Sequence, residues 1–374
     1  MRPAARHDRF SAAMPVHYTP ELEVPGAEEA EAIEAVVRDL RSIQETTSRD
    51  YGHAVRGVHA KGQALVRGQL RIHDHLPPDL AHGLFAVPGE HEAILRFSTN
   101  PGDVLDDAIS VPRGLAIKIF GVEGERLPDA PETDTQDLLL ANGPAFGAPD
   151  ARAFHHLLRL LSLSTDRAES MKKALSWTLG EIQRALTATG HRSRILGRLG
   201  GAPNVHPLGE TYFSQTPFLY GPYIAKFNLE PISPALRQVA GRIVEMRGRR
   251  DALRAEIDAI LEAEGGVWIL SAQLCVDPVA MPIEDATAVW NTALSPFVPV
   301  ATLSVSPQRS WAGGMSDVLD QRLAFNVWNG LAAHRPLGGI NRARKAAYAM
   351  SADYRATFNG CPVHRPAEVA QLLR

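Results

Sequence analysis

Four side chains near the end of the chain stand at spacings that place them on one face of a helix. Arg344, Tyr348, Ser351 and Arg355 follow one another at intervals of four, three and four residues. A phenol one turn from a guanidinium ionises more readily, because a nearby positive charge favours its anion. A phenolate is a good ligand for ferric iron, and the further arginine can bind a carboxylate through parallel hydrogen bonds. A row of solvent-facing side chains would have the same spacing.

A second candidate for chemistry is His59, in the segment RGVHAKG at residues 56–62. It stands at the entry of a strand-like run, and its flanking glycines let the backbone approach a flat ligand closely. An imidazole can take up and return a proton near neutral pH. A lone histidine is also commonly a hydrogen-bonded structural residue, so this segment alone does not decide between the two interpretations.

The remaining sequence indicates the elements that must position these residues. Apolar residues at spacings of three and four predict a helix over residues 28–47, after an arm at 1–27 that we expect to be mobile. Short runs bounded by Gly, Pro and Asp predict antiparallel strands at 64–72, 93–98, 114–120, 137–141, 210–229, 266–276 and 298–306. Helical patterns follow at 151–197, 234–263 and 338–356. This order predicts an α+β fold in which a β-barrel is surrounded by helices.

Composition excludes several classes of function. The 374 residues carry a net charge of −3 without a basic stripe, which argues against nucleic acid as a partner. No apolar run approaches the roughly 20 residues of a membrane span, and no signal peptide is indicated. The cysteines, Cys275 and Cys361, have no CxxC spacing, so neither a zinc site nor a disulfide framework is expected and a cytoplasmic location fits best.

The segment RGVHAKG resembles the RVVHAKG element of the haem-dependent catalase superfamily. Further segments resemble that family in the same order along the chain: Arg96 to Thr99 (RFST), Val111 to Lys118 (VPRGLAIK, compared with DPRGFAVK), Lys226-Phe227 (KFHY), residues 282–290 and 299–307, and Ala324 to Asn326. The helix near the C-terminus matches the motif RxxxYxxxxxxR at Arg344, Tyr348 and Arg355. The likeness covers roughly residues 50 to 356 and is scattered between 160 and 205.

The resemblance implies a single catalase-like haem domain at residues 28–374, with a barrel of about eight strands at 50–310. It implies haem b as cofactor, with Tyr348 as the iron ligand and Arg344 supporting its phenolate. His59 would be the acid-base group on the opposite, distal side, and Ser98 would orient it. The resemblance further assigns Arg56, Arg96 and Arg355 to the haem propionates and Phe154 to stacking on the porphyrin.

The sequence departs from the family pattern at the distal asparagine. A gapless match from Asp137 through Pro144 puts Ala141 on that position, and Asn142 follows one residue later. We expect the loop to present Asn142, because an amide donor there helps to polarise a bound peroxide. Gln136 also replaces a tryptophan of the family. The chain is shorter than ordinary catalases, which predicts a less wrapped pocket that admits larger molecules.

These inferences predict haem-dependent breakdown of hydrogen peroxide or organic hydroperoxides, with the possible involvement of an electron donor. One alternative is an allene-oxide-synthase-like enzyme that converts fatty-acid hydroperoxides. Another is a non-catalytic haem-binding protein that has lost efficient distal chemistry, which Ala141 would favour. The short arm is compatible with a homodimer or a monomer.

Overall fold

A closed barrel of antiparallel strands forms the centre of the protein. The computed structural model describes residues 14–131, 133–165 and 203–360. The strands are β1 (Gly62–Ile72), β2 (Glu90–Thr99), β3 (Arg113–Phe120), β4 (Thr135–Ala141), β5 (Tyr212–Phe213), β6 (Phe218–Tyr220), β7 (Tyr223–Pro231), β8 (Gly266–Leu274) and β9 (Val298–Val305). Their order is β5-β4-β3-β2-β1-β9-β8-β7-β6, and pairing of β5 with β7 closes eight of them into a ring.

Side chains alternate between the two faces of the barrel wall along β2, β3 and β4. Phe97 contacts Tyr212 and Trp268 from the far side of the barrel, so its row fills the interior. Burying side chains of this size stabilises the fold by roughly 1.5–3 kcal/mol each. Successive side chains of a strand point to opposite faces. The next row, in which Ser98 pairs with Gly114 and Gly114 with Ala141, therefore faces outward.

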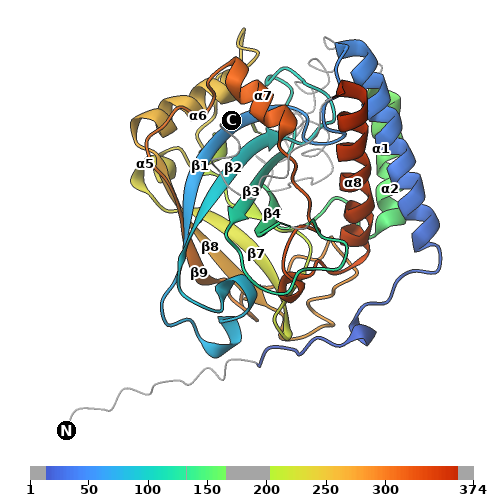
Figure 1. The fold of residues 1–374 in the computed structure, drawn as a ribbon, viewed down its shortest axis with the longest axis vertical. Helices are drawn as coiled ribbons and strands as arrows, with labels where there is room; N and C mark the ends of the chain where they lie inside the picture. The colour runs from blue at the N-terminus through green and yellow to red at the C-terminus, as the bar shows by residue number, and fades with distance from the viewer. Residues whose placement is uncertain (1–13, 132, 166–202, 361–374) are drawn as a thin grey trace, which may run out of the picture.

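Three helices pack side by side in a group next to the barrel (Figure 1). They are α1 (Glu29–Tyr51), α2 (Ala151–Thr165) and α8 (Gly339–Asn359). Apolar residues from all three meet in two small clusters, one built on Val36, Leu158 and Ala347 and the other on Ala32, Ala151 and Ala343. Apolar contacts thus hold the three helices together.

Shorter helices complete the fold. They are α5 (Pro234–Gln238), α6 (Ala252–Ala263) and α7 (Gly314–Arg322), with single 3-10 turns at Pro20–Leu22, Pro78–Leu80, Gly83–Phe85, Pro207–Gly209 and Ala332–His334. None of the described helices combines the length and apolar character that crossing a bilayer requires.

The α+β class and the eight-stranded barrel are confirmed. The single helix predicted over 234–263 is wrong, because the chain turns at Gly241 and Gly248, which adopt positive φ angles of 71° and 72° between α5 and α6. Helix α7 was not predicted. The helix expected to extend to residue 197 is described as far as Thr165, and the rest lies outside the described residues.

The predicted arm at 1–27 is described from residue 14 onward. Val16 donates its backbone N–H to Cys275 O at 2.8 Å, and Tyr18 donates to Pro222 O at 2.8 Å. Glu23 accepts hydrogen bonds from Gly338 N and from Arg342. This part of the arm therefore runs along the barrel and ends beside the start of α8 (Figure 1).

Candidate functional site

The backbone at His59 adopts a conformation that few side chains tolerate. Its φ angle is +54°, in the left-handed region. Two hydrogen bonds hold the segment there: His59 N donates to Asn100 O at 2.8 Å, and Ala60 N donates to Pro101 O at 2.9 Å. Strain of this kind persists only where the surroundings impose it, and it is concentrated at functional sites.

The imidazole of His59 is fixed from two sides by the outward row of the barrel. Its Nδ1 lies 3.1 Å from Ser98 Oγ. The Ser98 hydroxyl donates to Gly114 O at 3.4 Å, so its oxygen can accept a proton from Nδ1. The ring lies directly over Gly114, where a Cβ atom would stand 2.4 Å from His59 Cε1. Among the described residues, this arrangement leaves Nε2 without a partner, so it is the nitrogen that can accept a proton.

Electrostatics keep this imidazole neutral. Burial lowers the pKa of His59 from 6.5 to about 3, and the nearby positive charges of Arg96, Arg344 and Arg56 act in the same direction. A neutral imidazole at physiological pH can accept a proton, which a charged one cannot. The positive neighbours also show that Arg344 of α8 and the arginines of the barrel side surround the same space.

Helix α8 turns its predicted stripe toward the loop that carries His59. Ser351 Oγ accepts a hydrogen bond from Gly57 N at 3.1 Å, which joins the helix to residues two positions before the histidine. Arg344 Cζ lies 5.8 Å from the centre of the Tyr348 ring. Its Nη1 donates to Asn341 Oδ1 at 3.0 Å. Arg344 is thus held over the ring of Tyr348.

The hydroxyl of Tyr348 has no hydrogen-bond partner among the described residues. Its oxygen is not one of the fully buried polar atoms that lack a partner in this part of the chain. Tyr348 is partly buried and packs against the barrel core, and its phenol is not hydrogen-bonded within this part of the chain.

The three arginines predicted to bind carboxylates converge on Asp320 of α7. Arg96 donates through Nε and Nη2 to its carboxylate, and Arg56 Nη1 lies 3.1 Å from Oδ1. Burial raises the pKa of Asp320, but Arg56 and Arg96 outweigh this effect and lower it to about 2. Arg355 adds a third positive charge, and burial lowers its pKa to about 10. The cluster is charged and carries two more positive than negative groups.

Phe154 lies on α2 beside the same region. It packs with Val58, Leu158 and Ala347, and its ring meets that of Phe146 at 5.0 Å between centroids. Val58 immediately precedes His59, so the phenyl group lies near the histidine loop and α8. Its predicted stacking on a porphyrin stays a prediction.

Asn142 has partners away from the row that includes Ser98. Its Oδ1 accepts from Arg113 N at 2.9 Å, and its Nδ2 donates to Glu210 Oε1 at 2.8 Å. Ala141 pairs with Gly114, and Gly114 is the residue that lies beneath the imidazole of His59. The structure therefore differs from the expectation that the loop presents Asn142, because strand alternation puts Ala141 on that face.

Three residues important for this geometry were not assigned a role from the sequence. Gly114 lies in a motif that was recognised, but its contact with His59 depends on strand register. Asp320 and Glu210 act through partners more than sixty residues away, at Arg56, Arg96 and Asn142. No local pattern could have identified such pairs.

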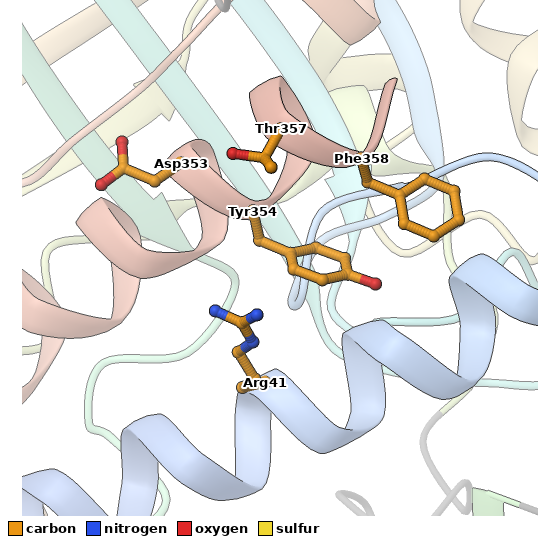
Figure 2. A pocket seen from close by; sticks show the side chains of 5 residues that line it. All are labelled: Arg41, Asp353, Tyr354, Thr357 and Phe358. Carbon is orange, nitrogen blue, oxygen red and sulfur yellow. The ribbon is translucent and has the colours of Figure 1, made fainter. Parts of the chain in front are cut away.

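A surface hollow of about 200 Å³ lies elsewhere and contains none of the predicted site residues. Figure 2 shows Arg41 of α1 reaching toward the Tyr354 ring of α8, with Asp353, Thr357 and Phe358 beside it. The Arg41 guanidinium is 4.9 Å from the ring centre. This hollow is on the α1 side of α8 and is separate from the His59 region.

Three solved structures with a similar fold are catalases. Catalase A from Saccharomyces cerevisiae has a TM-score of 0.56 at 16% identity, with 85% of this chain and 65% of that chain covered. A fungal catalase gives 0.57 at 17% identity, covering 85% and 64%. A bacterial catalase gives 0.56 at 19% identity, covering 98% and 70%. The chain has a catalase-like fold.

Sequence comparison adds one short match to this catalase-like fold. A linolenate 9R-lipoxygenase from Nostoc sp. is 35% identical over 101 residues, which cover 27% of this chain and 12% of that protein. The chain thus spans about two thirds of the yeast and fungal catalases and a small part of the lipoxygenase. No family model matches the sequence.

Proposed function

We propose that this chain is a haem-dependent enzyme that breaks down hydrogen peroxide or organic hydroperoxides. The observation that carries the proposal is the placement of His59. It is held in a strained backbone conformation with Nε2 free, on a barrel face opposite the Arg344 and Tyr348 stripe of α8. The catalase-like fold supports the same assignment.

The residues around this space fit haem b. The phenol of Tyr348 is free to act as the iron ligand, and Arg344 lies over its ring. The arginine cluster has an excess of two positive charges, which equals the charge of two propionates. Arg355 Nε is buried without a partner in the described part of the chain, so the cluster still has a donor to offer. Haem b, when bound, supplies an iron centre suited to O–O bond cleavage.

The chain's own contribution to the reaction is proton transfer. Nε2 of the neutral His59 accepts the proton of an incoming hydroperoxide and returns it to the oxygen that leaves. Ser98 and Gly114 hold the ring so that this nitrogen keeps one position. A placed general acid-base group accelerates a reaction by about a hundred- to ten-thousandfold.

A second candidate is the conversion of fatty-acid hydroperoxides. It is favoured by the short match to an enzyme named for linolenate and by Ala141, which pairs with Gly114 and has a methyl group where the resembling family has an amide. A smaller and less polar wall accommodates an alkyl chain more readily than an amide does. Both candidates use the same haem ligand and the same imidazole.

The test is to express the protein with haem supplied, record its visible spectrum and measure turnover. Hydrogen peroxide, an alkyl hydroperoxide and a linolenate hydroperoxide are compared as substrates, with oxygen release and substrate loss as the readouts. His59→Ala should retain haem and lose about a hundred- to ten-thousandfold in turnover. His73→Ala, just after the far end of β1, is the matched control and should keep full activity.

Each result has a definite meaning. A haem spectrum with His59-dependent turnover of any of the three peroxides supports the proposal, and the preferred substrate separates the two candidates. A haem spectrum without turnover would favour a haem-binding protein without catalysis. Absence of haem would overturn the proposed site.

A further inference from the structure

The C-terminal end of α7 closes over the arginine cluster. The carboxylate of Asp320 accepts Arg56 Nη1 at 3.1 Å and Arg96 Nη2 at 3.0 Å. Its side chain is 9% exposed, and that of Arg96 is 2% exposed. Gly62 at the start of β1 leaves the room for this contact, since a Cβ atom there would stand 2.8 Å from Asp320 Oδ2.

Backbone carbonyls at the end of α7 complete the contact. Leu323 O accepts Arg56 Nη2 at 2.7 Å, and Gln321 O accepts Arg355 Nη1 at 2.7 Å. The last carbonyls of a helix have no partner within it and carry partial negative charge. One carboxylate and one helix end together hold three guanidiniums that come from separate parts of the chain.

Such a cluster is unstable without a counter-charge. Like charges that are withdrawn from water repel one another, and removing one partner from a buried ion pair is strongly destabilising. Asp320 is the carboxylate that interacts with all three arginines within the described residues. It balances one of the three positive charges. The two that remain would be balanced by a ligand with two negative charges.

We propose that Asp320 is a built-in counter-anion that keeps the three arginines in place before the cofactor binds. This inference rests on the proposed haem function, in which the two propionates neutralise the remaining charges. Asp320 is then a positioning residue that matters most in the cofactor-free protein. Its carboxylate keeps the three arginines in the positions that bind the ligand. The same negative charge lowers the attraction of the cluster for an anionic ligand.

The alternative is that Asp320 merely stabilises α7. Both roles predict a less stable protein when the carboxylate is lost, but only the counter-anion role depends on the ligand. Two propionates can supply the negative charge that is lost with Asp320, whereas they cannot restore the stability of α7. The difference between apo and haem-bound protein therefore separates the two roles.

The experiment compares Asp320→Asn with Asp317→Asn, which removes the same charge from the first turn of the same helix. Thermal unfolding is measured for both variants without and with haem. We expect Asp320→Asn to lower the apo Tm by about 5 °C or more and the haem-bound Tm by less than half as much. Asp317→Asn should lower both by the same small amount. Asp320→Glu, which keeps the charge, should restore most of the apo stability.

Haem titration provides a second readout. Because Asp320→Asn makes the net charge of the cluster one unit more positive, the variant should bind haem b about tenfold more tightly than the original protein, while haem dimethyl ester should show no such gain. Equal destabilisation of the apo and haem-bound forms, together with unchanged haem affinity, would overturn the inference.

Sulfate distinguishes failure of this inference from failure of the proposed function. If the unmodified protein binds no haem, the proposed function fails, but the apo protein still reports on Asp320. Sulfate should then raise the Tm of apo Asp320→Asn more than that of apo Asp317→Asn. An equal response of both variants to sulfate would exclude the counter-anion role.

Discussion

The two sides of the candidate haem site are built in different ways. The side with Tyr348 is a single helix, α8, whose residues at 344, 348, 351 and 355 share a face through local periodicity alone. The side with His59 combines a strained loop with three neighbouring strands, whose register brings Ser98, Gly114 and Ala141 together. The first design holds a side chain by a regular backbone, and the second fixes a ring by contacts from several segments.

This difference teaches where each side is vulnerable. A change on the helix affects the residue that is replaced, because the helix itself persists. A change on the barrel side affects His59 even when another residue is replaced, because contacts with neighbouring residues fix the position of the imidazole.

Replacement of Tyr348 by Phe should have the largest effect, and it should be confined to haem binding. Loss of a residue that supports a metal ligand costs about ten- to a hundredfold in affinity, so loss of the ligand itself should cost more than about a hundredfold. Haem content after gel filtration, measured from the visible spectrum, checks this result. Tyr354→Phe, two turns further along α8, is the control and should retain haem. Normal haem content in Tyr348→Phe would remove the residue from its proposed role.

Gly114→Ala should disable His59 without touching it. The added methyl group would stand 2.4 Å from Cε1, so the ring must leave Ser98. Overpacking costs about 1–3 kcal/mol of stability, and loss of a positioned acid-base group should lower turnover by about a hundredfold or more while haem is retained. Steady-state kinetics and thermal unfolding measure both effects. Gly89→Ala, where nothing lies within 4 Å of the added atom, should change neither.

The pH dependence of stability should report on the same imidazole. The folded protein holds the pKa of His59 near 3, whereas the unfolded chain takes up this proton near 6.5. The unfolded state therefore binds more protons between these values, and stability falls as the pH drops from about 6.5 toward 3. His206 and His334, whose pKa values burial lowers to about 4, contribute with the same sign.

Comparison with His59→Ala isolates the contribution of one residue. Denaturant midpoints of the apo proteins at pH 7 and pH 4.5 should differ less for the variant than for the original protein. An equal loss of stability in both proteins would mean that His59 is not kept neutral by the fold.

The contrast also explains how much could be predicted from the sequence. The barrel and α8 follow from alternation and helical spacing, which are local signals. The choice between Ala141 and Asn142 depends on strand register, where a slip by one residue exchanges the two faces. Asp320 belongs to a helix that was not predicted, and its partners are distant in sequence. The motifs that resemble the catalase superfamily could therefore be predicted from the sequence, whereas the contacts between these motifs could not.

The orientation of Asn142 gives a smaller and more specific prediction. Asn142→Ala should remove the hydrogen bonds to Arg113 and Glu210 and cost about 1–3 kcal/mol of stability, because buried partners are left unsatisfied. Turnover per bound haem should stay within about twofold. Ala141→Asn, in contrast, should place an amide beside His59 and raise oxygen release from hydrogen peroxide relative to turnover of larger hydroperoxides. A loss of turnover in Asn142→Ala would mean that its amide reaches the substrate.

Ser351→Ala should have the smallest effect, and it tests whether the two sides are joined. Ser351 Oγ is the acceptor for Gly57 N, so its loss leaves a backbone donor unpaired and should cost about 1 kcal/mol. If this bond positions the His59 loop against α8, turnover should fall several-fold at unchanged haem content, and Ser351→Thr, which keeps the hydroxyl, should recover part of it. A stability loss with no change in turnover would show that each side is held independently, the barrel side by Ser98 and Gly114 and the helical side by α8 itself.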